Sequence, residues 1–126
     1  MNKVYAVASA AMIVALTVAL TIHVRADDKV IHDFMEKTHK GKDSPVQQVV
    51  AGKADEKLLK EFLAGYQAMA ATKPPKGDEA AWKKKCDALV QATQGLIDKK
   101  PEAAAAFKAA VDCKACHTEH KPQKQK

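Results

Sequence analysis

Apolar residues recur every three or four positions along most of the chain, the spacing that places them on one face of an α-helix. No segment alternates apolar and polar residues as a half-buried strand does. Stretches rich in glycine, proline, lysine and aspartate interrupt the pattern at residues 39–45, 72–78 and 99–101. The pattern predicts helices over about 28–40, 45–50, 55–71, 79–98 and 101–122.

The ends of the predicted helices carry residues that start or stop helices. Ser44 is a suitable N-cap residue ahead of Pro45, and Asp78 holds the same position ahead of Glu79. Pro101 fits the first turn of the last helix. The short segment 45–50 is counted as an extension of the first helix. The five predicted segments then make four amphipathic helices with mostly short connections. They predict an all-α fold, an antiparallel four-helix bundle.

The first 26 residues differ from the rest of the chain. Lys3 precedes an apolar run over residues 4–22, and Ala26 stands directly before the acidic pair Asp27-Asp28. This order predicts a signal peptide over residues 1–26, cleaved after Ala26. An uncleaved membrane anchor is the alternative, because the 19 residues of the run can just span a bilayer. In both cases the remainder is exported, which places it in the periplasm, free or membrane-anchored.

Composition narrows the classes of function. A chain of 126 residues supports one domain, assigned to 27–121, with a basic tail over 122–126. Only 5% of the residues are aromatic and alanine is abundant, so a bound cofactor would help a thin core to fold. Removal of residues 1–26 takes away Lys3 and Arg25 and leaves 19 basic and 15 acidic residues, with no arginine. Because arginine forks dominate base recognition, we expect no nucleic-acid partner.

The segment Cys113-Lys-Ala-Cys116-His117 carries the clearest chemistry. On a helix these three side chains share a face, since residues three and four apart are neighbours. Two thiols can then add to the vinyl groups of a haem while the adjacent imidazole meets the iron from the same side. The motif predicts one covalent haem c, attached through Cys113 and Cys116, with His117 as the proximal iron ligand.

Two other kinds of site compete for this motif. Zinc has four potential ligands in Cys113, Cys116, His117 and His120, but they crowd into eight residues with no opposing ligand pair. A redox dithiol requires a βαβ neighbourhood and a helix N-terminus that acidifies the thiol. Neither requirement is met by a motif late in an all-helical chain.

The chain resembles the class II cytochromes c, which comprise cytochrome c′ and the low-spin cytochromes c-556. The resemblance covers about residues 28–121 and rests on a signal peptide, four helices and a single "CKACH" close to the C-terminus. Weaker matches are "FMEK" ahead of "VVAGK", and "EAAWKKKCDAL". The resemblance implies a left-handed four-helix bundle with haem between its helices, electron transfer as the usual role, and homodimerisation as an option. The family often places an arginine near the haem propionates; here lysines must serve, or the propionates face water.

The sixth iron ligand is expected from the first helix, across the haem from His117. His32, Met35 and His39 lie there at positions i, i+3 and i+7 and share a face. Met35 is central in the apolar stripe, and the "FMEK" resemblance also places methionine at this position. We therefore predict Met35 as the sixth ligand and His39 as the runner-up. Met35 as ordinary core beside a five-coordinate iron is the remaining alternative.

These features predict an exported mono-haem c-type cytochrome that carries one electron at a time. We do not expect an enzyme, because no nucleophile–base pair or carboxylate dyad stands out. The alternatives are a five-coordinate, gas-binding protein like cytochrome c′ and a zinc-stapled structural module. The expected partners are redox proteins, acidic ones if lysines near the haem edge steer the encounter.

Four further side chains are interpreted as structural. Met69, Trp82 and Cys86 fall on apolar helix faces and are expected in the core, with Trp82 also a candidate for haem contact. His120 lies one turn beyond His117 at the end of the last helix, and we expect it at the surface.

Overall fold

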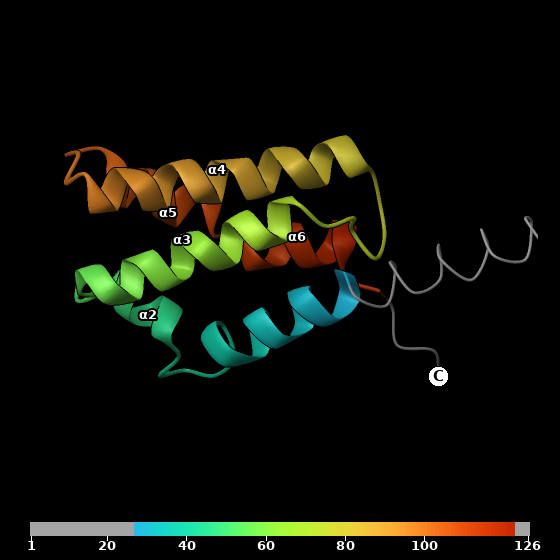
Figure 1. Cartoon of the computed structure of the whole chain (residues 1–126), viewed down its shortest axis with the longest axis horizontal. Helices are drawn as coiled ribbons and strands as arrows, with labels where there is room; N and C mark the ends of the chain where they lie inside the picture. The colour runs from blue at the N-terminus through green and yellow to red at the C-terminus, as the bar shows by residue number, and fades with distance from the viewer. Residues whose placement is uncertain (1–26, 123–126) are drawn as a thin grey trace, which may run out of the picture.

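The computed structural model describes residues 27–122 as helices and connecting loops, with no strand in that range (Figure 1). The predicted all-α class is confirmed for this part of the chain. The signal peptide or anchor predicted for 1–26, and the tail beyond 122, fall outside the described residues. None of the described helices is both long and apolar enough to cross a bilayer. The helices are 27–38, α2 (Pro45–Val50), α3 (Glu56–Ala70), α4 (Glu79–Ile97), α5 (Ala103–Ala110) and α6 (Cys113–His120).

Helix 27–38, α3 and α4 lie along one long axis and run in opposite directions in turn, while α5 and α6 follow each other in the same direction (Figure 1). Helix α4 packs antiparallel to α3 along most of its length and also packs on α5, while the short α2 contacts α5. Helix 27–38 lies along α3 on the side away from α4, near α6 (Figure 1). The C-terminal half of the chain therefore returns past α4 and brings α6 close to the first described helix.

Aspartates at three helix starts explain where those helices begin. The side chains of Asp55, Asp78 and Asp112 accept hydrogen bonds from backbone N–H groups three residues ahead, at 2.8, 2.8 and 2.9 Å. Ser44 holds the predicted N-cap position of α2, but its side chain makes no capping bond and its buried Oγ has no hydrogen-bond partner among the described residues. The cap predicted at Asp78 is confirmed.

The prediction of one continuous helix from Pro101 onward is wrong. Helix α5 ends at Ala110, and Val111 leaves the helical region with φ −82° and ψ 47°. Asp112 then caps a new helix, α6, whose first residue is Cys113. An aspartate favours the N-cap over the helix interior, because its short side chain competes for backbone N–H groups. The cysteine motif therefore opens a helix instead of lying within one.

The core is built around a few aromatic rings. Phe62, Tyr66 and Phe107 are completely or almost completely buried, and Phe34 meets Phe62 and Tyr66 edge-on at centroid distances of 5.9 and 5.3 Å. Gly65 allows this approach of helix 27–38 to α3, because a Cβ there would overlap the Phe34 ring. The same core contains Met69, Trp82 and Cys86, as predicted from their helix faces.

Candidate functional site

A cavity of about 640 Å³ opens between segment 28–40 and residues 116–122. Its volume lies within the range of cofactor and small-molecule sites. We call it the α6 cavity. The lining residues that bear on its chemistry are Ile31, Met35, His39, Trp82, Cys116 and His117.

The structure gathers most of the predicted site residues around this cavity. Met35 and His39 line it from one side, and Cys116 and His117 line it from the other. Cys113 does not line it: its thiol is exposed and lies 3.7 Å from the carbonyl oxygen of Val111. The two elements that the sequence paired across a haem therefore do face each other.

His39 is held by a directional chain of hydrogen bonds. The Thr38 hydroxyl donates to the Phe34 carbonyl at 2.5 Å, so its oxygen can only accept from His39 Nδ1–H, at 2.6 Å. His39 Nε2 then carries the lone pair and accepts from the Tyr66 hydroxyl at 3.0 Å. Both ring nitrogens are therefore engaged within the protein.

The surroundings of His39 also keep its ring neutral. Its pKa is lowered to about 4, first by burial and then by repulsion from His117. Burial likewise raises the pKa of the Tyr66 hydroxyl, so this group stays a donor. To bind iron, His39 would have to release Tyr66. Met35 is half-buried, packs against the core and has no such bond to break, so the geometry favours Met35 over His39 as a ligand.

The cysteine motif offers a neutral imidazole and two different thiols. The pKa of His117 is lowered, first by partial burial and then by Lys121, and the neutral ring is the form that binds metals. Burial is the main cause that raises the pKa of the half-buried Cys116 thiol. Cys113, Cys116 and Cys86 are all free thiols, and burial raises the pKa of Cys86 to about 12.

The two rival sites fare differently against this geometry. The start of α6 at Cys113 supplies the helix N-terminus that a redox dithiol needs, which the sequence interpretation missed. The raised pKa of the half-buried Cys116 shows that this thiol is not the activated one, so in such a pair the attacking thiol would be the exposed Cys113. Within residues 27–122, no three histidine, cysteine, aspartate or glutamate side chains are grouped to hold a metal ion. The potential zinc ligands Cys113, Cys116, His117 and His120 do not form such a group in this part of the chain.

His120 is not at the surface, and that prediction is wrong. Only 2% of it is exposed, and its ring packs edge-on against Trp82 with the centroids 5.2 Å apart. Its Nδ1 lies 3.0 Å from the carbonyl oxygen of Lys76, in the loop between α3 and α4. That loop covers the end of α6, and a contact 44 residues away in sequence left no trace in the local pattern.

The loop approaches α6 closely because of Gly77. This residue has φ +85°, and a Cβ on it would lie 2.7 Å from the Glu119 carbonyl oxygen and 3.1 Å from His120 Nδ1. An ion pair between Lys85 of α4 and Glu119 holds the same end of α6. These contacts anchor the C-terminal turn of α6 on α4 and on the loop.

One atom of His120 has no partner. A carbonyl oxygen only accepts, so Nδ1 carries a proton that it donates to the Lys76 carbonyl, and in the neutral ring Nε2 then holds a lone pair. Nε2 is buried, makes no hydrogen bond to any described residue, and has Glu119 Oε1 3.7 Å away. His120 also lines the α6 cavity. An unsatisfied buried polar atom costs about 1–3 kcal/mol, so this atom calls for a partner.

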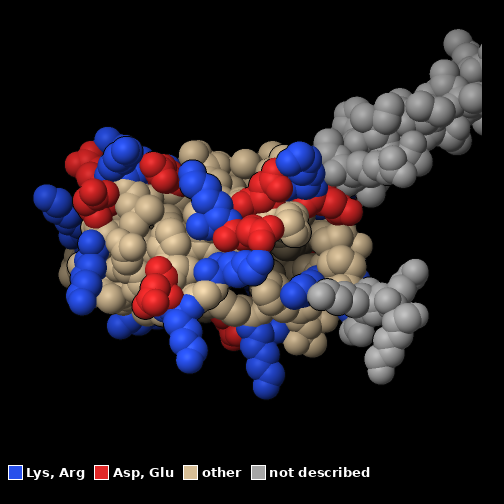
Figure 2. Space-filling view, turned by 90° about the horizontal axis from the view of Figure 1, so that it is seen from below, with Lys and Arg blue, Asp and Glu red and all other residues tan. Residues whose placement is uncertain are grey.

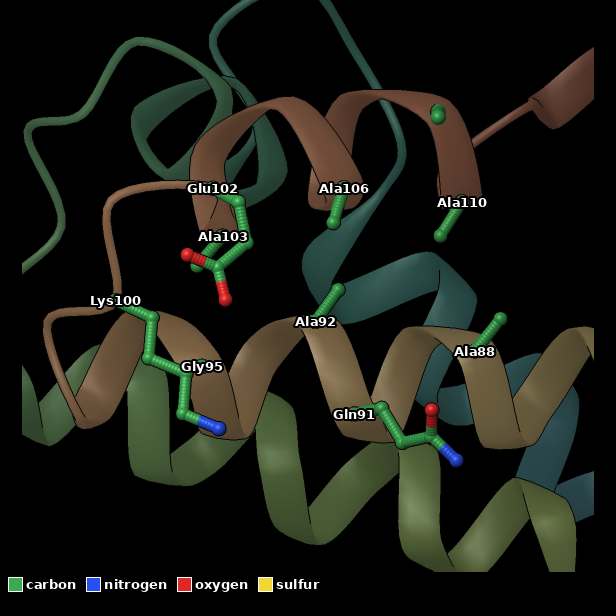
Figure 3. Close-up of a pocket in the computed structure, with 10 residues that line it drawn as sticks. Ala88, Gln91, Ala92, Gly95, Lys100, Glu102, Ala103, Ala106 and Ala110 are labelled. Carbon is green, nitrogen blue, oxygen red and sulfur yellow. The ribbon is translucent and has the colours of Figure 1, made fainter.

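A second hollow, of about 480 Å³, lies between α4 and α5 (Figure 3). Figure 3 shows small side chains such as Ala92, Ala106 and Ala110 lining it from both helices. Its only ionisable side chains are Lys100 and Glu102. This alanine groove reflects the close packing of two helices with small residues and brings together no reactive groups.

Comparison with models of known protein families, with curated protein sequences and with solved structures finds no match to this chain.

Proposed function

We propose that the protein is an exported mono-haem cytochrome of the class II type that carries single electrons. The observation that carries this proposal is the α6 cavity. Cys116 and His117 of the haem-attachment motif line one wall, and Met35 lines the wall across from them. Residues of the cysteine motif and Met35, which is about 80 positions earlier in the chain, thus line one cavity whose volume suits a cofactor.

The chemistry of the lining supports a haem in this cavity. Ile31 and Trp82 are apolar surfaces suited to a flat, largely apolar ring. His117 is favoured in the neutral form, and Met35 offers a soft thioether sulfur, the pair found in low-spin electron-transfer haems. The buried Nε2 of His120, which has no hydrogen-bond partner within residues 27–122, adds one polar group to the cavity lining.

Each residue then has a defined task. When bound, haem supplies reversible one-electron exchange at its iron. Cys113 and Cys116 hold it through thioether bonds, one from the exposed start of α6 and one from its half-buried face. His117 and Met35 offer the nitrogen and sulfur donors, while Ile31 and Trp82 exclude water from the cavity.

We further propose that the helices form an antiparallel four-helix bundle around this haem. Helix 27–38, α3 and α4 are three of its members, and the consecutive helices α5 and α6 together form the fourth. Export is proposed on the signal-like segment 1–26 and on the chemistry of the motif, since haem attachment takes place outside the bacterial cytoplasm. The chain is then periplasmic, or membrane-anchored if that segment stays uncleaved.

A five-coordinate, gas-binding protein is the competing proposal. The observation in its favour is that Met35 packs against the apolar core, as an ordinary core methionine does. The same cavity and the same haem attachment serve both proposals. They differ only in the sixth position of the iron.

The proposed function predicts haem that cannot be extracted. Expressed with a c-type maturation system, the protein should stay red after denaturation and after acid–acetone extraction, because thioether bonds survive the loss of coordination. The joint variant Cys113→Ala and Cys116→Ala should lose all covalent haem, while Cys86→Ala should retain it. Haem absent from the wild type, or removed by extraction, contradicts the proposal.

An electron carrier with an acidic partner should also show salt-dependent kinetics. Lys40 and Lys121 line the α6 cavity. Figure 2 shows lysines interspersed with acidic side chains over the face that is seen from below. Electron exchange with an acidic redox protein is expected to slow as ionic strength rises, because salt screens the steering charges. Stopped-flow rates for Lys121→Gln should fall and lose part of this dependence, unlike those for Lys108→Gln on α5. A salt-independent wild-type rate would exclude a steering role for the lysines.

A further inference from the structure

His120 holds an unused hydrogen-bonding atom inside the cavity proposed for the haem. The side chain is 2% exposed and its Nε2 has no hydrogen-bond partner within residues 27–122. The ring cannot turn freely to find one, because Nδ1 is bound to the Lys76 carbonyl and one face meets Trp82. The position of Nε2 is therefore set before any ligand arrives.

This inference rests on the proposed function, that is, on a haem in the α6 cavity. A haem has only two kinds of group that a histidine nitrogen can bind. One is the iron, which takes nitrogen directly. The other is the pair of propionate side chains, the only hydrogen-bonding substituents on the ring. His117 follows the attachment residue Cys116 directly and is the iron ligand of the motif, which leaves the propionates for His120.

We propose that His120 Nε2 binds a haem propionate through one shared proton. In the neutral ring Nε2 carries a lone pair, and a carboxylate oxygen does so as well, so the two atoms repel unless a proton lies between them. Solvent supplies that proton when the contact forms, and no bond between heavy atoms is made or broken. The buried nitrogen then gains the partner that it lacks.

The shared proton couples to the charge on the iron. Oxidation adds one positive charge to the haem and lowers the proton affinity of the His120–propionate pair, while reduction raises it. The pair therefore loses its proton at a lower pH in the oxidised protein than in the reduced protein. Between these two pH values the reduction potential must fall as the pH rises. A fully coupled proton changes the equilibrium tenfold per pH unit, which corresponds to 59 mV for one electron.

Some of the charged groups around His120 already have a partner or face solvent. Glu119, the acid nearest Nε2, is paired with Lys85. His32 also lines the cavity, but its side chain is 71% exposed and faces solvent. The charged and titratable groups that line the cavity with His120 or lie near it on the neighbouring elements are Cys116, His117, Glu119, Lys121, Lys85, Lys76, Asp78, Asp28, His32, Glu36, His39 and Lys40.

The test is the reduction potential of the haem-loaded protein as a function of pH. The wild type should show a downward slope approaching 59 mV per pH unit over part of the range. His120→Gln and His120→Phe should both flatten that slope, Gln because its amide does not titrate and Phe because it keeps only the packing on Trp82. The matched control is His32→Gln, which removes an exposed histidine of the same cavity and should keep the slope.

The possible outcomes separate this inference from the proposed function. If no covalent haem is present, the proposed function fails. If haem is attached and His120→Gln keeps the wild-type slope, or the wild type has none, only the role of His120 is wrong. A change of iron spin state in His120→Gln would make His120 an iron ligand and would overturn the proposal as well. Should His120→Phe fail to fold, the His120→Gln comparison still decides.

Discussion

Replacing Met35 by leucine is expected to convert a low-spin iron to high spin. Leucine nearly matches methionine in volume but has no donor atom, so the cavity should keep its shape with a fold stability within about 1.5 kcal/mol of the wild type. The reduction potential should fall, because a methionine ligand raises it. The open sixth position should also raise carbon monoxide binding. Absorption spectra of the ferrous protein, with and without carbon monoxide, measure both effects.

His39→Ala is the matched comparison for this variant. Both nitrogens of His39 are held, by Thr38 and Tyr66, so its removal should leave the iron low-spin. If His39→Ala becomes high-spin while Met35→Leu stays low-spin, the ligand is His39. A wild-type protein that is already high-spin and binds carbon monoxide supports the gas-binding proposal instead.

Gly65→Ala is expected to destabilise the fold by up to about 2 kcal/mol. The new Cβ would overlap the Phe34 ring, and overpacking of this kind costs about 1–3 kcal/mol. The gain from placing alanine in a helix in place of glycine, about 1 kcal/mol, offsets only part of that loss. Phe34 also supports Tyr66 and His39, so the wall of the α6 cavity should loosen too. Urea denaturation followed by circular dichroism gives the change in the free energy of unfolding.

Gly95→Ala provides the control within another helix. A Cβ there would lie 3.1 Å from the Ala103 Cβ, a tight contact that a small shift relieves, so the net change should be near zero. The double variant Phe34→Leu with Gly65→Ala should show less additional loss than Gly65→Ala does in the wild type, because the overlapping ring is gone. Equal destabilisation by Gly65→Ala and Gly95→Ala would show that Phe34 does not determine the effect.

Local features of the sequence were enough to predict the helices and much of the core. Prolines, glycines and capping aspartates such as Asp78 act on the backbone within one turn, so their effect is visible without tertiary structure. Helical spacing likewise reports which residues share a face, and it identified Met69, Trp82 and Cys86 as core residues. It also predicted Cys113, Cys116 and His117 on one face; Cys116 and His117 line the α6 cavity, and Cys113 does not.

Helical periodicity does not reveal the helix that starts at Cys113. Asp112 is followed by residues that continue the helical pattern, so the pattern predicts one helix through the motif. The capping bond from Ala115 shows that the aspartate ends one helix and begins another. The signal was present in the sequence, but periodicity alone does not distinguish an interior aspartate from a cap.

Only the tertiary structure determines which segment packs against each helix face. The segments that pack against His39 and His120 determine the chemistry of the α6 cavity. His39 is engaged by Tyr66, 27 positions later in the chain, and His120 by Lys76, 44 positions earlier. Periodicity assigns a residue to a helix face but does not identify the segment packed against that face. Whether a histidine is neutral, buried or unpartnered depends on that neighbouring segment, because burial and hydrogen bonds set its protonation. The sequence alone therefore determined the motif and the helices, and only the packing of distant segments showed which nitrogen atoms are free to bind.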